Sequence, residues 1–292
     1  MEETRPIRSG DYLLSILGVA ALRDLFTAPA SVPDRVQEMV HVVEHAEEFP
    51  FDFAVRFVEY DVVDGYTAWS ASYDQPDSNP AIMVEEELTA AQLAAAPPGR
   101  ALDVACGTGR QVERLERLGY EVSGIDLTPA MVDRASARCP KADLRVGDWT
   151  ALPYADDTFD LVTSALALCH ATDVAAPIRE MARVLRPSGW LVISDVHPFS
   201  TIHGGAAAFP GDDAGHIPFV RNCVHLLSEY FAAFRDAGLD VRDLREGRAE
   251  AEHVALLPSY AVFPDATRQA FVGTPTIVSW TAAKPARDQP TA

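Results

Sequence analysis

The chain has 292 residues and a mass of 31.7 kDa, with 48% hydrophobic and 23% charged residues, which is typical of a folded globular protein and excludes a disordered or fibrous chain. Its 24 basic and 43 acidic residues give a net charge of -19, which opposes binding to nucleic acid or to an anionic membrane surface. The four cysteines show no CxxC spacing, so we expect neither a zinc site nor a disulfide framework, and a cytoplasmic location fits.

Residues 1–65 predict a helical extension that ends in an aromatic-rich stretch. Apolar residues recur at helical spacing over residues 11–26, and a second helix begins near Ser31. The alternation from Phe51 to Phe57 hints at a strand before Asn and Pro residues turn the chain into a loop. We expect this extension to act as a lid, and a homodimer interface is the alternative.

From residue 81 onward, helices and short apolar strands alternate along the chain. The expected helices are 81–95, 110–118, 129–137 and 174–185, and the expected strands are 101–105, 121–126, 143–146, 159–164 and 190–195. Strands that are separated by crossover helices predict an α/β fold with a doubly wound parallel sheet.

A segment rich in Gly, Pro and His follows the fifth of these strands. It starts at residue 197 and is too long for a routine connection, so we expect a lid or a mobile loop. After it come a predicted helix at 225–237 and two closing strands at 240–246 and 276–282. Residues 285–292 are expected to form a flexible tail.

The most informative motif is ALDVACGTGR at residues 101–110, where a strand runs into a glycine turn at the start of a helix. Because Gly107 and Gly109 lack Cβ atoms, main-chain N–H groups can face an anion, while Asp103 can meet a cationic group. The dinucleotide fingerprint G-x-G-x-x-G would need Gly or Ala where Val112 stands, and this disfavours a nicotinamide oxidoreductase.

This motif resembles motif I of the class I S-adenosylmethionine-dependent methyltransferases, (D/E)-x-(A/G)-x-G-x-G, at every defined position. Asp126, at the end of the next strand, stands where an acidic residue of the family accepts both ribose hydroxyls. Gly147-Asp148-Trp149 is similar to the adenine-binding segment, in which the Asp takes the exocyclic amine and the next residue covers the ring.

Two further stretches carry the same resemblance. LPYADDTFDLVTS is similar to the segment that enters the family's fourth strand, and MARVLRPSGW is similar to the turn before its fifth strand. In that turn Ser188 stands where the family more often has Gly, and Gly189 is kept.

The resemblance covers residues 66–284 and implies the class I methyltransferase fold, a Rossmann-like, doubly wound seven-stranded sheet. An N-terminal helical extension precedes it, and a lid insertion over residues 197–224 follows the fifth strand and covers the acceptor. The implied cofactor is S-adenosylmethionine, and no metal is required. Carried over by motif position, the cofactor-binding residues are Tyr73, Asp103, Ala105, Gly107, Gly109, Asp126, Leu127, Met131, Gly147, Asp148, Trp149 and Ala165.

An aromatic element precedes this domain. The run GYTAWSASYD at residues 65–74 is similar to the Y-x-x-W-(A/S)-x-x-Y-D element that closes over the cofactor in small-molecule members of the family. Tyr66 and Tyr73 are therefore candidates to contact the methionine carboxylate or to shape the methyl channel, with Trp69 packing the lid. Simple core packing is the alternative interpretation of this cluster.

His170, at the end of the fourth strand, is the first candidate for a general base, and His197, at the end of the fifth, is the second. The alternative is that each histidine only forms hydrogen bonds with the backbone. We expect methyl transfer to O, N or C of a small organic acceptor in secondary metabolism. Three alternatives remain open: a protein of this fold that binds the cofactor without methyl transfer, such as a cyclase; a nicotinamide oxidoreductase; and a non-catalytic subunit.

Overall fold

The computed structural model describes residues 6–75, 79, 81–211 and 215–286. Counting only the described residues, the chain forms two compact units. The smaller unit comes from the ranges 1–59, 208–219 and 248–274, and the larger unit comes from the ranges 60–207, 220–247 and 275–292. No single cut in the chain separates these units, and the expected boundaries at residues 65 and 284 stay a prediction. From residue 287 on, the expected tail lies outside the described residues.

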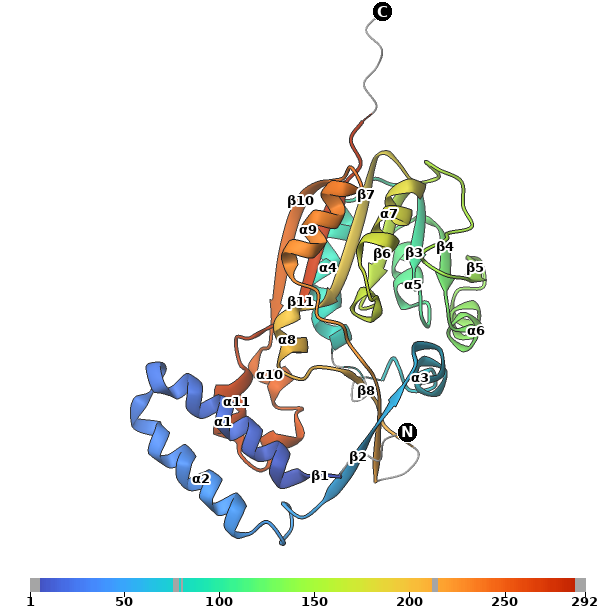
Figure 1. Cartoon of the computed structure of the whole chain (residues 1–292). Helices are drawn as coiled ribbons and strands as arrows, with labels where there is room; N and C mark the ends of the chain where they lie inside the picture. Colours follow the sequence, from blue (N-terminus) through green and yellow to red (C-terminus); the bar gives the residue numbers. More distant parts are fainter. Residues whose placement is uncertain (1–5, 76–78, 80, 212–214, 287–292) are drawn as a thin grey trace, which may run out of the picture. The chain divides into compact units, whose positions relative to one another are not determined.

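The larger unit is built on a seven-stranded sheet with the order β10-β11-β7-β6-β3-β4-β5 (Figure 1). The strands, in chain order, are β3 (Arg100–Val104), β4 (Glu121–Asp126), β5 (Asp143–Val146), β6 (Phe159–Ala165), β7 (Leu185–Val196), β10 (Asp240–Arg248) and β11 (Pro275–Ala283). β3 pairs in parallel with β4 and β6, and β11 runs antiparallel to β7. The seven-stranded, doubly wound sheet predicted from the sequence is confirmed.

The direction of winding reverses at β3. From β3 the chain continues outward to β4 and β5, and it then returns to β6 on the other side of β3 before it reaches β7. In open α/β sheets, ligands bind beyond the carboxyl ends of the strands at this kind of switch point. The edge formed by the carboxyl ends of β3, β4 and β6 is therefore the place to look for a site.

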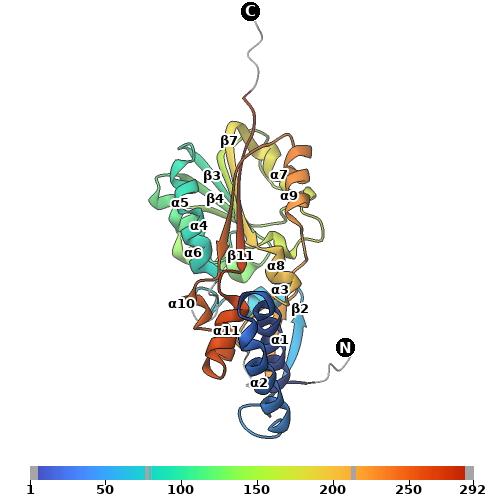
Figure 2. The same cartoon turned by 90° about the vertical axis from the view of Figure 1, so that its left-hand side faces the viewer.

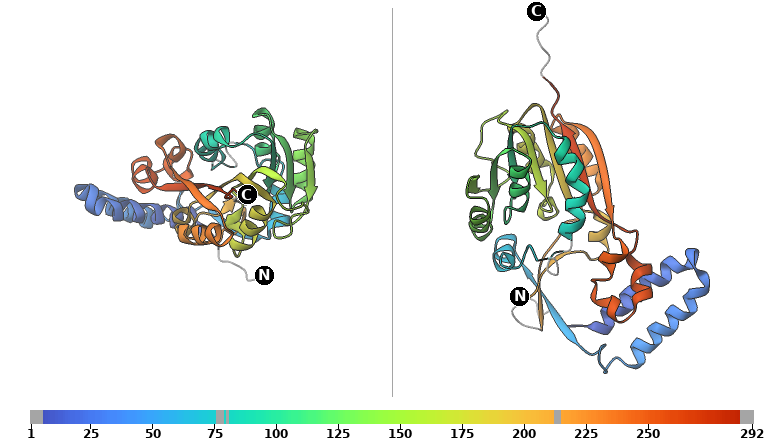
Figure 3. Two further views of the ribbon diagram at one scale, coloured as in Figure 1. Left: turned by 90° about the horizontal axis from the view of Figure 1, so that it is seen from above. Right: turned by 180° about the vertical axis from the view of Figure 1, so that it is seen from behind.

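Helices cover both faces of this sheet, as Figure 2 shows. On one face lie α4 (Ala81–Ala95), α5 (Arg110–Arg117) and α6 (Pro129–Arg138), and on the other lie α7 (Ala175–Val184) and α9 (Leu227–Asp236). The rear view in Figure 3 shows α4 running along the sheet. Because both faces are covered, the central strands are buried along most of their length.

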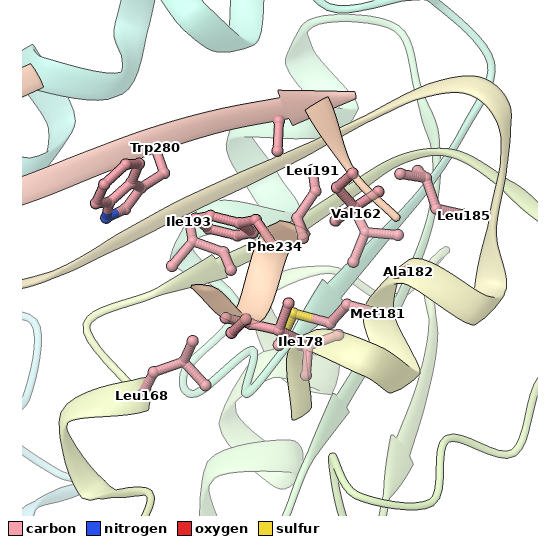
Figure 4. Packing of buried hydrophobic residues seen from close by; sticks show 14 of the residues in the cluster. Val162, Leu168, Ile178, Met181, Ala182, Leu185, Leu191, Ile193, Phe234 and Trp280 are labelled. Atoms are coloured by element: carbon pink, nitrogen blue, oxygen red, sulfur yellow. The ribbon is translucent and has the colours of Figure 1, made fainter. Parts of the chain in front are cut away.

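The main core lies between the sheet and the α7 and α9 face (Figure 4). Ile178 and Met181 of α7, Phe234 of α9 and Ile193 of β7 have no exposed surface. The Phe234 ring lies 5.5 Å from the ring of Trp280 on β11. Full burial of each such side chain contributes about 1.5–3 kcal/mol, so this core firmly fixes the strands whose ends carry the site.

Three short helices complete the larger unit. These are α3 (Val62–Trp69), a 3-10 turn η2 (Leu168–His170) and α8 (Pro198–Ile202). Asp61 begins α3 by accepting the Asp64 N–H at 2.9 Å, which is an ordinary N-cap. No helix within the described residues is both long and apolar enough to cross a membrane.

The smaller unit combines segments from three parts of the sequence. Its helical elements are α1 (Ser9–Thr27), η1 (Pro29–Ser31), α2 (Val32–Glu44), α10 (Ala251–Val254), η3 (Pro258–Ala261) and α11 (Pro264–Phe271). A four-stranded sheet has the order β1 (Ile7–Arg8), β2 (Ala54–Tyr60), β9 (His216–Val220) and β8 (Ala207–Ala208). Leu13 and Leu17 of α1 share one core with Ala266 and Ala270 of α11. Both N-terminal helices were predicted, whereas α10 and α11 were not.

Candidate active site at the carboxyl edge of the sheet

The turn after β3 has an unusual backbone. Ala105, Gly107 and Gly109 have φ values of 59°, 52° and 81°, so three residues out of five are left-handed. Such turns make neighbouring main-chain N–H groups converge on one side, where an anion or a polar ligand can bind. A non-glycine residue with positive φ is uncommon and is often found at functional sites.

The two glycines have different packing roles. A Cβ on Gly109 would lie 2.9 Å from the Ala135 Cα, so this glycine is needed for the close approach of α6. A Cβ on Gly107 would have no protein atom within 4 Å. Gly107 is also partly exposed, and its backbone is therefore open to a ligand.

Asp126 ends β4 beside this turn. One carboxylate oxygen accepts the Gly107 N–H at 2.8 Å, and the other accepts the Thr128 N–H at 2.8 Å. Burial raises the pKa of Asp126, and these two backbone donors oppose that rise. Each carboxylate oxygen has more than one lone pair, so the group can still accept hydrogen bonds from ligand hydroxyls.

Asp103 lies beneath the turn, where it is 1% exposed and accepts a hydrogen bond from the Thr163 hydroxyl at 2.7 Å. Burial raises the pKa of Asp103 to about 7, although the Thr163 hydrogen bond and the Arg110 charge lower it. A carboxyl group in this state gains a negative charge near neutral pH, which would favour a cationic group of a ligand.

The predicted adenine-binding segment, Gly147-Asp148-Trp149, follows β5, the strand next to β4. The Gly147 N–H donates to the Asp126 carbonyl at 2.9 Å, which places the two predicted segments side by side. Asp148 is exposed, and one of its carboxylate oxygens accepts from the Thr150 N–H and hydroxyl, both at 2.7 Å. The Trp149 side chain packs on the edge of the main core and stays partly exposed.

The remaining predicted cofactor residues differ in accessibility. Leu127 is exposed next to Asp126, and Ala165 is partly exposed at the end of β6. Met131 is buried on α6, with 1% of its surface exposed, so a cofactor contact by its side chain would need a rearrangement. The structure thus brings most of the predicted residues to one edge but leaves Met131 inside the packing.

The aromatic element forms a ring cluster at the same edge. The Tyr66 ring lies 5.7 Å from Trp69 and 5.9 Å from Tyr73, and Trp69 lies 4.9 Å from Tyr73. Burial raises the pKa of Tyr73 to about 12, so its phenol is neutral at physiological pH. The cluster also reaches His170, whose ring lies 5.4 Å from Tyr66.

Asp74 anchors this element to the glycine turn. Its carboxylate accepts the Thr108 hydroxyl at 2.8 Å and pairs with Arg138 of α6 at 2.5 Å. In the sequence, Asp74 ends the Y-D element without a predicted role, and no motif points to Arg138. The available signal was the position of Asp74 in that motif.

The two candidate histidines have different hydrogen-bond partners. His170 contacts the Tyr66 hydroxyl through Nε2 at 2.7 Å and the Arg221 carbonyl through Nδ1 at 3.0 Å. His197 accepts the Phe199 N–H through Nδ1 at 3.1 Å, as the N-cap of α8, and contacts Glu246 through Nε2 at 2.9 Å. The lone pair of His197 Nδ1 is thus occupied by a backbone N–H, and in the neutral ring Nε2 carries the hydrogen towards Glu246, so this arrangement leaves His197 no nitrogen that can take a proton from an acceptor.

Among the described parts of the chain, no group of three His, Cys, Asp or Glu side chains is placed to hold a metal ion. The geometry of the edge is instead that of an organic ligand site: an open backbone turn, an acidic residue beside it and aromatic side chains nearby.

Comparison with known proteins gives matches in this region. Residues 102–193 match the methyltransferase domain family. The chain is 36% identical over 116 residues to the demethylmenaquinone methyltransferase of Renibacterium salmoninarum. This aligned stretch covers 38% of this chain and 49% of that protein. It is 35% identical over 151 residues to the 27-O-demethylrifamycin SV methyltransferase of Amycolatopsis mediterranei, covering 48% and 54%. The matched stretch thus spans about half the length of these curated relatives.

Solved structures agree on the fold. A chain of the complex between the Haloferax volcanii Trm112 methyltransferase activator and a methyltransferase has a TM-score of 0.58 and 24% identity, and the match covers 78% of this chain and 100% of that one. A geranyl diphosphate methyltransferase has a TM-score of 0.52 and 18% identity, covering 70% and 77%. With the domain match and the strand and turn geometry described above, residues 102–193 form a methyltransferase domain, and the larger unit has the class I methyltransferase fold.

Proposed function

We propose that this protein transfers the methyl group of S-adenosylmethionine to a small organic acceptor. The observation that carries the proposal is the meeting of Asp126 with the open turn at Gly107, 2.8 Å apart. An acidic residue at the end of one strand and a glycine turn at the end of its neighbour form the arrangement that binds a nucleoside in doubly wound folds.

The residues at this edge fit the parts of that cofactor. Asp126 can accept the ribose hydroxyls, and the exposed Asp148 carboxylate can accept the adenine amine while Trp149 offers an aromatic face. The turn at Ala105 and Gly107, with Asp103 beneath it, suits the amino-acid end. The cofactor supplies an electrophilic methyl group on a positively charged sulfur, so the protein must align donor and acceptor and remove any proton.

The proposed acceptor class is a small or medium-sized organic molecule. The names of two relatives give demethylmenaquinone and 27-O-demethylrifamycin SV as acceptors, which are small molecules rather than protein or nucleic acid. A net charge of -19 disfavours a nucleic-acid acceptor. That residues 1–65 and 197–224 cover the acceptor stays a prediction from the sequence.

Titration calorimetry with S-adenosylmethionine, S-adenosylhomocysteine and NADH tests this function. We expect binding of the first two ligands with one site per chain, and no binding of NADH, since the third glycine of the dinucleotide fingerprint is absent. If only NADH bound, the protein would be an oxidoreductase. If S-adenosylmethionine bound but stayed intact after acceptor turnover, the protein would use it without methyl transfer.

A further inference from the structure

A hydrogen-bonded chain at the site joins the Tyr66 hydroxyl, the His170 ring and the main-chain carbonyl of Arg221. We propose that Tyr66 and His170 form a proton relay that deprotonates a hydroxyl group of the acceptor, with Tyr66 as the residue that meets the acceptor. The proposal rests on the methyltransferase function and narrows the acceptor to molecules with an ionisable O–H group, such as phenols, hydroquinones and enols.

The hydrogen-bond partners of the His170 ring determine which atom donates and which accepts in each hydrogen bond. A carbonyl oxygen can only accept, so Nδ1 must carry the hydrogen that is donated to Arg221. In the neutral ring, Nε2 is then unprotonated and accepts the Tyr66 hydroxyl proton at 2.7 Å. Burial lowers the pKa of His170, which keeps the ring neutral and able to take a proton at physiological pH.

An acceptor proton has to reach His170 through Tyr66. Both ring nitrogens of His170 already have protein partners, and Tyr66 is the partner of the nitrogen that can act as a base. Burial raises the pKa of Tyr66 well above its usual value, so its phenol stays neutral. A phenol oxygen that donates its own proton keeps lone pairs and can accept a hydrogen bond from the acceptor.

The relay lies at the predicted cofactor edge. His170 ends η2, which follows β6, and β6 pairs with β3 ahead of the glycine turn. The Tyr66 ring lies 5.9 Å from Tyr73, whose neighbour Asp74 accepts the Thr108 hydroxyl of the glycine turn, so Tyr66 lies close to that turn. Trp69 and Tyr73 pack around the Tyr66 ring, and the partly exposed Tyr73 offers an aromatic surface that suits a planar acceptor, whereas Trp69 is buried.

The proton and electron balance of the step is complete. The acceptor oxygen forms a bond to the methyl carbon, and the bond from that carbon to sulfur breaks, which leaves a neutral thioether. The acceptor proton moves to the Tyr66 oxygen as the Tyr66 proton moves to His170 Nε2. The positive charge passes from sulfur to the His170 ring, where the Arg221 carbonyl stabilises it.

Alternatively, the hydrogen bond between Tyr66 and His170 only holds α3 against η2 and takes no part in proton transfer. The two roles differ in their dependence on the acceptor. A relay matters only for acceptors that arrive protonated, because an acceptor that is already ionised needs no base. A structural tie would affect every acceptor to the same extent.

The test measures transfer of a labelled methyl group from S-adenosylmethionine to 4-methylphenol, 1,4-naphthalenediol and 4-nitrophenol at slightly alkaline pH, where only the last is mainly ionised. The variants are Tyr66→Phe and His170→Gln, and Tyr260→Phe on η3, outside the segments proposed to cover the acceptor, is the matched control. Calorimetry with S-adenosylmethionine accompanies each variant and reports whether the cofactor site is intact.

We expect Tyr66→Phe and His170→Gln to lower transfer to the two protonated acceptors roughly 10²–10⁴-fold, with a much smaller loss on 4-nitrophenol and unchanged cofactor affinity. Equal losses on all three acceptors would overturn the relay in favour of a structural tie. A wild-type protein that binds the cofactor but methylates none of them would overturn the acceptor class. Absence of cofactor binding would instead contradict the methyltransferase function itself.

Discussion

The Asp126 carboxylate accepts the Gly107 backbone N–H at 2.8 Å, so the acidic residue that ends β4 also holds the turn that follows β3. The second carboxylate oxygen holds the Thr128 N–H at the start of α6. Asp126 therefore organises the backbone around the proposed nucleoside site in addition to offering acceptors to the ribose. A substitution at this position changes both the direct contacts and the shape of the turn.

Cofactor affinity should depend on pH through Asp103. Burial raises the pKa of Asp103 to about 7, and the ionised form is the one that favours the ammonium group of the cofactor. As pH falls from 7.5 to 5.5, Asp103 becomes protonated while the α-amino group, with a usual pKa of roughly 7.7–8.0, stays charged. We expect the dissociation constant from calorimetry to increase as pH falls across this range.

The Asp103→Asn variant separates this effect from general acid sensitivity. It should bind S-adenosylmethionine more weakly than the wild type at pH 7.5 and show a flatter pH dependence. If the variant and the wild type had parallel pH profiles, Asp103 would not be the group responsible.

Asp195 should reduce stability as pH rises. It has 0% exposure, accepts the Tyr230 hydroxyl and the Val196 N–H, and burial raises its pKa to about 6. Between the ordinary aspartate pKa and about 6, Asp195 loses its proton in the unfolded chain but keeps it in the folded chain. The stabilising contribution of protonated Asp195 is therefore fully present at low pH and is lost as pH rises. Relative to Asp195→Asn, the wild type should lose on the order of 2–3 kcal/mol of unfolding free energy between about pH 4 and 7.

Urea denaturation of both proteins across this pH range measures the difference, and Asp133→Asn on the exposed face of α6 is the control. The Asp133 variant should track the wild type at every pH. A constant difference between wild type and Asp195→Asn would show that Asp195 ionises normally in the fold.

Replacing Ser188 with glycine should stabilise the folded protein. It has a φ of 68°, and it stands where the family turn more often has Gly. The left-handed conformation costs an L-residue roughly 1–2 kcal/mol, part of which glycine loses again through the greater freedom of the unfolded chain. We expect Ser188→Gly to raise the unfolding free energy by up to about 1 kcal/mol.

Ser136→Gly, on the exposed face of α6, is the opposite control because glycine weakens a helix interior by about 1 kcal/mol. In thermal unfolding, we expect a higher midpoint for Ser188→Gly and a lower midpoint for Ser136→Gly. A lower midpoint for Ser188→Gly would mean that the serine side chain makes a contact that outweighs the backbone cost.

The local parts of the site could be predicted from the sequence because each is a strand followed by its own turn. Asp103, Gly107 and Asp126 stand at fixed places in such strand and turn patterns, and the order of the strands then brings them to one edge. The same logic predicted His170 at the end of the fourth strand, whereas β6 ends at Ala165 and His170 ends the 3-10 turn η2 that follows it.

Contacts between distant residues could not be predicted in this way. Tyr66 and His170 are 104 positions apart, and Asp74 and Arg138 are 64 apart, so no periodicity links them. The helices α10 and α11 are only four and eight residues long, too short for a clear apolar repeat. The partners of His197 depend on where β10 brings Glu246, which the sequence does not state.

Titration of S-adenosylmethionine into the wild-type protein and the Asp126→Ala variant, with Asp133→Ala as the control, is the most direct test of the proposed cofactor site. We expect binding to the wild type and the control, and binding that is roughly 1.5–3 kcal/mol weaker in Asp126→Ala, the scale of hydrogen bonds to a charged group. Equal affinity in a folded Asp126→Ala protein, or no binding to the wild type, would contradict the proposed cofactor site.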